Sequence, residues 1–233
     1  RQRIKSYKGK HAFGNYLQQG EMLWGSGLVL AAWMTLESMK SPLHGMHVLE
    51  LGSGLGTAGL VTAALGAEEV VLSDRSGPVF ESLQRNVEVN HGDSVCKVRA
   101  VCLDWTKQSR GELEARHFDA IIGSDILYDS GLFPSLLRTL DELLLPGGSF
   151  LLVDPGRLGC SGCQAFADLI VEERPTWTIQ VDTLSAATQF AREQVPNVEI
   201  FLPEQRRHGI AVALGSHALE TTLSLKKLIA ADE

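Results

Sequence analysis

The chain has 233 residues, 44% hydrophobic and 21% charged, which is the composition of a globular protein able to bury a core without disulfide or metal staples. Its formal net charge of -7 disfavours a nucleic-acid backbone as partner, because phosphate binding needs a basic surface, and suits a cationic substrate better. No apolar run reaches the roughly 18 residues of a membrane span, and the basic N-terminus is not followed by the apolar segment of a signal peptide, so we expect a protein of the cytoplasm or nucleus.

Apolar runs typical of buried strands alternate with segments of helical periodicity through most of the chain. The expected strands span 47–52, 69–74, 96–105, 118–128 and 149–156. Helical spacing precedes the first strand at 25–39, with Ser26 as the candidate N-cap, and separates the later strands at 57–67, 78–90, 134–144 and 163–173. This alternation predicts βαβ units with helices on both faces of a parallel sheet.

Two further strand-like runs, 177–185 and 208–215, complete the pattern and are expected to pair antiparallel at one edge of the sheet. The predicted fold is therefore an α/β, Rossmann-like, doubly wound sheet of seven mostly parallel strands with an antiparallel edge strand. We expect one domain over residues 1–233. Within it, 1–23 would be an N-terminal segment for substrate, 24–215 the core and 216–233 a C-terminal surface helix.

The segment Val48–Leu60, "VLELGSGLGTAGL", marks the expected ligand site, because ligands of open parallel sheets bind beyond the carboxyl ends of the strands. It contains G-x-G-x-x-G, which is typical of a dinucleotide-binding turn with a pyrophosphate at the helix N-terminus. It also contains Gly52-x-Gly54-x-Gly56 directly after a strand that carries Glu50.

Glu50 favours the second pattern. A carboxylate two residues before the first glycine would repel phosphates at short range but would suit a positively charged ligand. S-adenosylmethionine carries an ammonium and a sulfonium and no phosphate, so it fits the turn better than a dinucleotide. Gly59 then falls inside the following helix, where we expect it to allow close packing on the sheet.

Asp74 ends the second strand about 20 residues beyond the glycines, where a carboxylate can accept hydrogen bonds from the hydroxyls of a ribose. This position indicates a nucleoside cofactor but does not distinguish the two candidates. A turn-forming aspartate before "RSGP" is the structural alternative.

Cysteine and histidine patterns indicate neither disulfides nor a metal. Cys96, Cys102, Cys160 and Cys163 are too few and too scattered for a disulfide framework, and "CSGC" is a single C-x-x-C without a second pair at zinc spacing. The seven histidines include no H-x-x-x-H pair, and neither G-x-S-x-G nor a P-loop motif is present.

The motifs "LELGSGLG", "LSD", "LDW" and "GSDILYD" occur in the order seen in seven-β-strand (class I) methyltransferases. The chain resembles most closely the family 16 branch, chiefly protein lysine methyltransferases. "LWGSGLVLAAWM" is similar to the W-P-S-(A/G)-x-x-L segment of that branch, with Gly25 where proline is usual, and Asp125-Ile-Leu-Tyr128 matches its D-x-x-Y motif. The resemblance spans about Trp24 to Asp154.

This resemblance implies a site for S-adenosylmethionine that is assembled from several loops. The implied cofactor contacts are Trp24 packed beside the cofactor, Gly52, Ser53 and Gly54 lining its methionyl part, Asp74 at the ribose, Asp104 and Trp105 at the adenine, and Ser124 at the inner wall next to Asp125. Glu50 and Gly56 join them as cofactor-binding candidates from the turn itself. Core packing is the alternative for the two tryptophans.

Asp125 and Tyr128 are the candidate catalytic residues. Methyl transfer from a sulfonium needs mainly alignment of the nucleophile, a suitable charge environment and loss of a proton from the amine. Asp125 can bind the incoming amine and balance its developing charge, and Tyr128 offers an aromatic face and a hydroxyl to orient it. A structural carboxylate beside a buried tyrosine is the alternative.

The sequence therefore predicts a monomeric S-adenosylmethionine-dependent N-methyltransferase acting on a protein side chain, most simply lysine. Arginine, histidine or a small amine as acceptor remain open. Two alternatives from other classes are an NAD(P)-dependent oxidoreductase and a non-catalytic cofactor-binding interaction protein.

Overall fold

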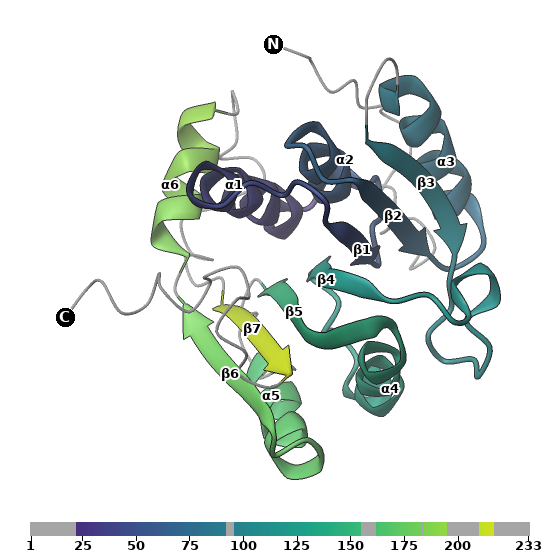
Figure 1. The fold of residues 1–233 in the computed structure, drawn as a ribbon, viewed down its shortest axis with the longest axis vertical. Helices are drawn as coiled ribbons and strands as arrows, with labels where there is room; N and C mark the ends of the chain where they lie inside the picture. The colour runs from purple at the N-terminus through teal and green to yellow at the C-terminus, as the bar shows by residue number, and fades with distance from the viewer. Residues whose placement is uncertain (1–21, 92–95, 155–161, 183, 195–209, 217–233) are drawn as a thin grey trace.

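The computed structural model describes residues 22–91, 96–154, 162–182, 184–194 and 210–216. They form a seven-stranded sheet with helices on both faces (Figure 1). The strands are β1 (His47–Leu51), β2 (Glu69–Asp74), β3 (Lys97–Cys102), β4 (Phe118–Ser124), β5 (Leu144–Asp154), β6 (Trp177–Asp182) and β7 (Ile210–Ser216). The helices are α1 (Gly25–Lys40), α2 (Thr57–Ala64), α3 (Pro78–His91), α4 (Phe133–Leu143), α5 (Gly162–Glu173) and α6 (Ser185–Gln194), with short 3-10 turns η2 (Gly111–Leu113) and η3 (Ser130–Leu132).

The strand order is β3-β2-β1-β4-β5-β7-β6, and the first five strands are parallel. The predicted α/β fold with a Rossmann-like parallel sheet is confirmed. The antiparallel strand does not lie at the edge, where it was predicted: β7 runs antiparallel to both β5 and β6 and lies between them, so the edge strand is β6. The two last strands do pair antiparallel, as their alternation predicted.

Helices α1, α2, α3 and α6 cover one face of the sheet, and α4 and α5 cover the other (Figure 1). Alternation of side chains along β1 divides its residues between two cores: Val48 lies in the first, and Leu49 and Leu51 lie in the second. Both faces of the central strands are thus buried, which explains their nearly continuous apolar sequence.

Several element boundaries differ from the sequence prediction. Helix α1 begins at Gly25 with Trp24 as the N-cap residue, so Ser26 is not the cap and is instead buried in the first turn. Strand β4 ends at Ser124, because Asp125 takes a left-handed backbone conformation with φ of 56°. Strand β5 begins earlier than predicted, at Leu144, with a register shift opposite β4 that accommodates the following Pro-Gly-Gly.

Helix α6 was not predicted, because Phe190 is its only large apolar residue and the residues it buries, Ala187 and Ala191, are small. It packs against α1. The predicted C-terminal helix, Cys160 and nearly all of the N-terminal segment lie outside the described residues. Within the described ranges, no helix combines the length and apolarity needed to cross a membrane.

Glu50 connects β1 to the start of α2. Its side chain points to the α1–α2 face of the sheet and is 2% exposed, and its Oε2 accepts a hydrogen bond of 3.0 Å from the backbone N–H of Gly59. That N–H belongs to the first turn of α2, where intrahelical acceptors are lacking. Burial raises the pKa of Glu50 to about 8, above its ordinary value of 4.5, against the opposing effect of the Gly59 hydrogen bond.

Gly59 allows this contact because it has no side chain. A Cβ at Gly59 would lie 2.6 Å from Glu50 Oε2 and 2.8 Å from Leu72 Cδ2, both closer than real Cβ atoms come. The prediction that Gly59 serves close helix–sheet packing is confirmed.

Replacing Gly59 by alanine should therefore destabilise the fold, by about 1–3 kcal/mol from overpacking. Chemical denaturation gives the change in the free energy of unfolding. Gly27→Ala is the matched control in α1, because its nearest atom, Ser124 Oγ, would be at an ordinary 3.6 Å. The free energy of unfolding of that variant should be unchanged or should rise by up to about 1 kcal/mol, because alanine has the higher helix propensity. Equal destabilisation of both variants would contradict the packing argument.

The raised pKa of Glu50 predicts a pH-dependent stability. The folded state keeps a proton that the unfolded state loses above about 4.5, so this stabilisation is complete below that pH and is lost as pH rises towards 8. Glu50→Gln keeps an acceptor for Gly59 but cannot titrate. From pH 5 to 8, wild type should lose stability relative to the variant by at most about 1.4 kcal/mol per pH unit.

Urea denaturation at several pH values measures this difference, with Glu88→Gln, at an exposed position of α3, as the control that should follow wild type. A constant difference between wild type and Glu50→Gln across the range would show that Glu50 titrates as an ordinary carboxylate.

Candidate functional site

The candidate site lies where the carboxyl ends of β1, β2, β3 and β4 meet. Because these strands are parallel, the loops that follow them open at the same end of the sheet. Strand β1 lies between β2 and β4, so the chain order reverses at β1, and the groove beyond such a switch point is where open α/β sheets bind ligands.

The glycine turn after β1 requires its glycines for two reasons. Gly52, Gly54 and Gly56 have φ values of 62°, 54° and 79°, in the left-handed region that favours glycine. A Cβ at Gly52 would lie 2.7 Å from Ile126 Cγ2 and 3.4 Å from Trp105 Cη2. The structure therefore brings the turn, the loop after β3 and the loop after β4 into direct contact.

Carboxyl groups already occupy backbone donors that an anion would need at this turn. Glu50 accepts the N–H of Gly59, and Asp74 Oδ2 accepts the N–H of Gly54 at 2.8 Å. A pyrophosphate at the start of α2 would compete with both carboxyl groups, so the geometry disfavours a dinucleotide. The reason differs from the predicted one: with its pKa raised to about 8, Glu50 acts by occupying a donor rather than by its charge.

Asp74 lies at the end of β2 with its carboxylate half-buried beside the turn. Its two oxygens accept the backbone N–H groups of Gly54 and Arg75, each at 2.8 Å. Burial raises the pKa of Asp74, and these two hydrogen bonds oppose the rise. Each carboxylate oxygen keeps a second lone pair, so the group can still accept hydrogen bonds from the hydroxyls of a ribose.

Ser53 links the turn to β1 and β2 through hydrogen bonds. It is 8% exposed, donates through Oγ to the carbonyl of Glu50 at 3.2 Å, and accepts the N–H of Ser73 at 3.0 Å. Ser73 Oγ donates to the same carbonyl at 2.7 Å, and Asn86 Nδ2 donates to the carbonyl of Leu55 at 2.9 Å. Ser53 and Glu50 thus hold the turn in place, and their direct contact with a cofactor stays a prediction.

Asp104 and Trp105 follow β3. Asp104 Oδ1 accepts the hydroxyl of Thr106 at 2.6 Å and its N–H at 3.0 Å, and these bonds lower the pKa of Asp104 with help from Lys107. Trp105 is half-buried, and its indole lies against Gly52 of the glycine turn. This placement suits a flat ligand group better than a wholly buried core aromatic would.

Trp24 and Ser124 belong to the start of α1 and the end of β4. The carbonyl of Trp24 accepts the N–H groups of Gly27 and Leu28 at the start of α1, and its side chain is half-buried. Ser124, at the end of β4, has its Oγ 3.6 Å from where a Cβ of Gly27 would be. The segment that resembled the family 16 pattern therefore meets the end of β4.

Asp125 is held in an unusual backbone conformation. It is a non-glycine residue with φ of 56°, which costs about 1–3 kcal/mol in general and persists only where the surroundings fix it. Its N–H donates to the carbonyl of Val153 on β5 at 2.8 Å. Ala115 and Leu184 also have positive φ, so what marks Asp125 is its place at the carboxyl end of β4 beside the glycine turn, and its role stays a prediction.

Tyr128 is 56% exposed, so the alternative of a buried structural tyrosine is excluded. The residue after it, Asp129, accepts the N–H of Gly131 at 2.9 Å and starts the 3-10 turn η3. The loop thus presents an accessible aromatic side chain three residues after a fixed aspartate.

Two residues that fix this loop, Ile126 and Leu127, were not predicted from the sequence. Ile126 and Leu127 are 4% and 1% exposed. A Cβ at Gly162, the first residue of α5, would lie 2.5 Å from the carbonyl oxygen of Leu127. Gly162 was the one hint in the sequence, because a glycine at the start of a helix can mark a close contact. Its partner, Leu127, is known only from the structure.

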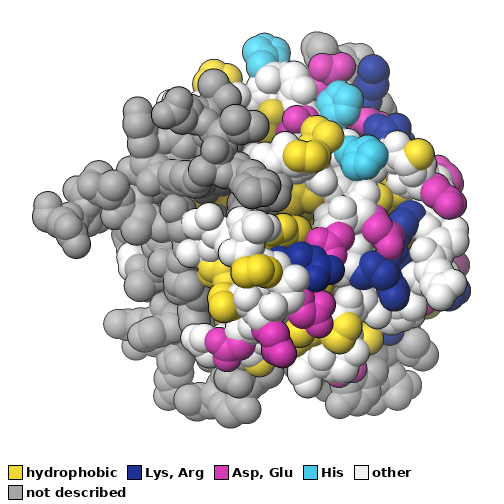
Figure 2. Space-filling view, turned by 60° about the horizontal axis from the view of Figure 1, so that its bottom comes forward, with side chains coloured by type: hydrophobic (Ala, Val, Ile, Leu, Met, Phe, Trp, Pro, Cys, Tyr) yellow, Lys and Arg dark blue, Asp and Glu magenta, His cyan; other side chains and the backbone are white. Residues whose placement is uncertain are grey.

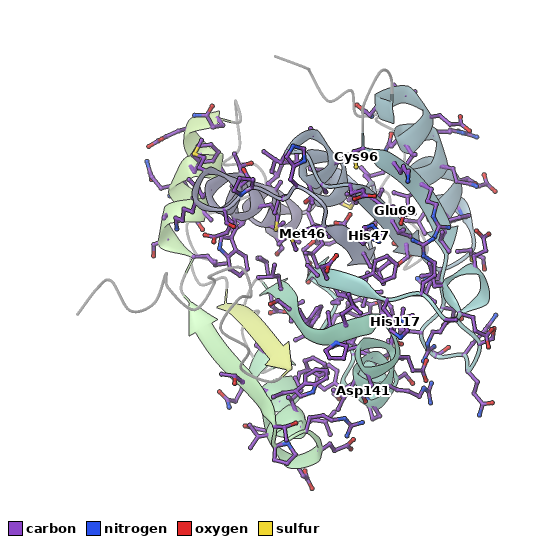
Figure 3. All side chains as sticks on the ribbon, in the orientation of Figure 1. Met46, His47, Glu69, Cys96, His117 and Asp141 are labelled. Atoms are coloured by element: carbon purple, nitrogen blue, oxygen red, sulfur yellow. The ribbon has the colours of Figure 1, made fainter. Side chains whose placement is uncertain are left out.

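The amino ends of the strands carry a separate ion-pair cluster. Glu69 interacts with Arg99 Nε at 3.2 Å and with Arg116 Nη2. Its carboxylate also lies 4.0 Å from His47 Nδ1, and Figure 3 labels both of these residues. These contacts join β1, β2, β3 and the start of β4 at the end of the sheet opposite the candidate site. In the ranges that the structure describes, no three His, Cys, Asp or Glu side chains could hold a metal ion.

Figure 2 shows acidic and basic side chains interspersed over the described part of one face. That part of the face therefore carries no continuous basic stripe of the kind that binds nucleic acid.

Residues 11–157 match the lysine methyltransferase family. Protein N-lysine methyltransferase METTL21A of Xenopus tropicalis is 40% identical over 123 residues, which cover 52% of this chain and 54% of the relative. Protein-lysine N-methyltransferase EFM3 of Chaetomium thermophilum is 34% identical over 141 residues, covering 57% of this chain and 41% of that one. The chain thus spans about half the length of these curated relatives.

Among solved structures, the chain is similar to magnesium protoporphyrin IX methyltransferase (ChlM) from Synechocystis PCC 6803 with bound SAM. The TM-score is 0.59 at 15% identity, over 89% of this chain and 87% of that one. At this identity the likeness concerns the fold. The family match covers more than half of the sequence and contains the glycine turn, Asp74 and the Asp125–Tyr128 loop, and the chain belongs to the lysine methyltransferase family.

Proposed function

We propose that this protein binds S-adenosylmethionine and transfers its methyl group to the side-chain nitrogen of a lysine in a protein substrate. The observation that carries the proposal is the contact between the glycine turn and the loop that holds Asp125 and exposes Tyr128. Family membership and relatives named as protein lysine methyltransferases support the same activity.

The residues of the site fit this cofactor. The half-buried Trp105 would lie beside the adenine, Asp74 keeps acceptor capacity for the ribose, and the left-handed backbone at Gly52 and Gly54 would bring the turn close to the methionyl part. When bound, S-adenosylmethionine supplies an activated methyl group on sulfur whose leaving group is a neutral thioether. The rest of the catalytic task, alignment and charge balance, falls to the protein.

Asp125 and Tyr128 would act on the lysine. The lysine nitrogen must lose a proton before it attacks, and it gains positive charge as the new carbon–nitrogen bond forms. The Asp125 carboxylate would accept a hydrogen bond from the amine and balance that charge. Tyr128 would place its aromatic face beside the aliphatic stem and cationic end of the side chain. The proton would leave to solvent, which reaches the exposed Tyr128.

Arginine, histidine and small-amine acceptors are the competing substrates of this proposal. A monomeric state and a location in the cytoplasm or nucleus stay predictions, as does the division of the chain into a substrate segment, a core and a C-terminal helix. A scaffold without catalysis is the competing proposal from another class, and only a measurement of methyl transfer separates the two.

Asp125→Asn should lower methyl transfer by about a hundredfold or more, because the amide keeps the shape but loses the charge that balances the ammonium. The measurement is incorporation of a radiolabelled methyl group into proteins of a cell extract, followed by mass spectrometry of the labelled residue. Asp129→Asn is the matched control, because an amide oxygen can still accept the N–H of Gly131, and should stay within about twofold of wild type. Equal labelling by wild type and Asp125→Asn would remove Asp125 from the mechanism.

Calorimetric titration should detect binding of S-adenosylhomocysteine and none of NAD(H). Asp74→Ala should weaken the binding of S-adenosylhomocysteine by at least about tenfold, because it removes the ribose acceptor together with the hydrogen bond to Gly54. Tight NAD(H) binding without a response to S-adenosylhomocysteine would restore the oxidoreductase alternative.

A further inference from the structure

Ile126 occupies the point where the candidate cofactor turn meets the candidate catalytic loop. Its side chain is 4% exposed. A Cβ at Gly52 would lie 2.7 Å from its Cγ2, and a Cβ at Gly123 would lie 2.8 Å from its Cδ1. Gly123 is the register partner of Leu51, the residue before Gly52. The isoleucine therefore fills space left open by two glycines, Gly123 on β4 and Gly52 in the turn directly after the neighbouring strand β1.

The same isoleucine lies between two sets of residues with proposed functions. Trp105 Cη2 and Ile126 Cγ2 both lie close to Gly52, so the indole and the isoleucine line the same side of the turn. Immediately before Ile126 is Asp125, whose N–H is bonded to Val153 and whose φ of 56° leaves its backbone little freedom. Ile126 is fixed in the core directly after Asp125, so a shift of the Ile126 side chain would move the backbone that carries the Asp125 side chain.

We propose that Ile126 is a positioning residue, which holds the Asp125–Tyr128 loop against Gly52 so that the cofactor turn and the amine-binding side chains keep one relative geometry. This inference rests on the proposed function. In-line methyl transfer is sensitive to such geometry, because displacement of a reacting group by about 1 Å can cost a hundredfold in rate. A buried isoleucine that only stabilised the core would have no such effect.

Three variants separate positioning from packing. Ile126→Ala removes both contacts, whereas Ile126→Val keeps the β-branch that faces Gly52 and loses only the terminal methyl that faces Gly123. Ile121→Ala is the matched control, because Ile121 is fully buried in the same core cluster, within β4.

The readouts are the affinity for S-adenosylhomocysteine by calorimetry, the maximal rate of labelled methyl transfer and the KM for S-adenosylmethionine, alongside the urea midpoint of unfolding. Ile126→Ala should weaken binding and lower the maximal rate by about tenfold or more each. Ile121→Ala should lower the urea midpoint by about as much as Ile126→Ala does, but should leave the affinity and the maximal rate within about twofold of wild type. Ile126→Val should recover binding to within about threefold of wild type.

A double variant tests whether Ile126 acts through Asp125. Adding Ile126→Ala to Asp125→Asn should lower the maximal rate by clearly less than the tenfold expected of Ile126→Ala alone, because one of the two side chains that Ile126 positions has already lost its function. If the double variant lost the product of the two single losses in maximal rate, the proposal would be overturned. Equal affinity and equal maximal rate for Ile121→Ala and Ile126→Ala would overturn it too. If wild type transfers no methyl group, the proposed function fails, and the binding comparison of the two alanine variants still decides the role of Ile126 at the turn.

Discussion

The site depends on one buried hydrogen bond, from the backbone N–H of Gly59 to the carboxyl group of Glu50. It fixes the start of α2 against β1, and the glycine turn is the chain between these two points. Because Glu50 is 2% exposed and sits beside Leu72, ionisation is costly, and its pKa is raised to about 8. A neutral carboxyl group can still accept the hydrogen bond, so the turn keeps its shape without a buried charge.

The turn, once fixed, decides what kind of ligand the sheet can accept. Dinucleotide sites leave the amides at the helix start free for a pyrophosphate. Here acidic side chains take the amides of Gly54 and Gly59, so the turn offers close backbone approach without the anion-binding capacity. That combination distinguishes two cofactor classes that share almost the same glycine spacing, and it arises from Glu50 and Asp74 rather than from the glycines.

The sequence predicted the fold and the location of the site well, because both follow from local patterns. Apolar runs bounded by glycine and aspartate place β1 and β2 within a residue of their observed ends. The sequence could not predict that β4 stops at Ser124 or that β7 lies inside the sheet, since these depend on contacts with β5. Ile126 was missed for the same reason: between two motif residues it looks like any core isoleucine.

The arrangement around the turn also limits where substrate choice can reside. Glu50, Ser53 and Ile126 are buried and committed to holding the turn and the loop, so they are constrained by geometry whatever the acceptor is. Among the site residues, Tyr128 is the one with most of its side chain exposed. Under the proposed function, differences in substrate would act through this exposed side of the loop, while the buried side would keep methyl donor and acceptor aligned.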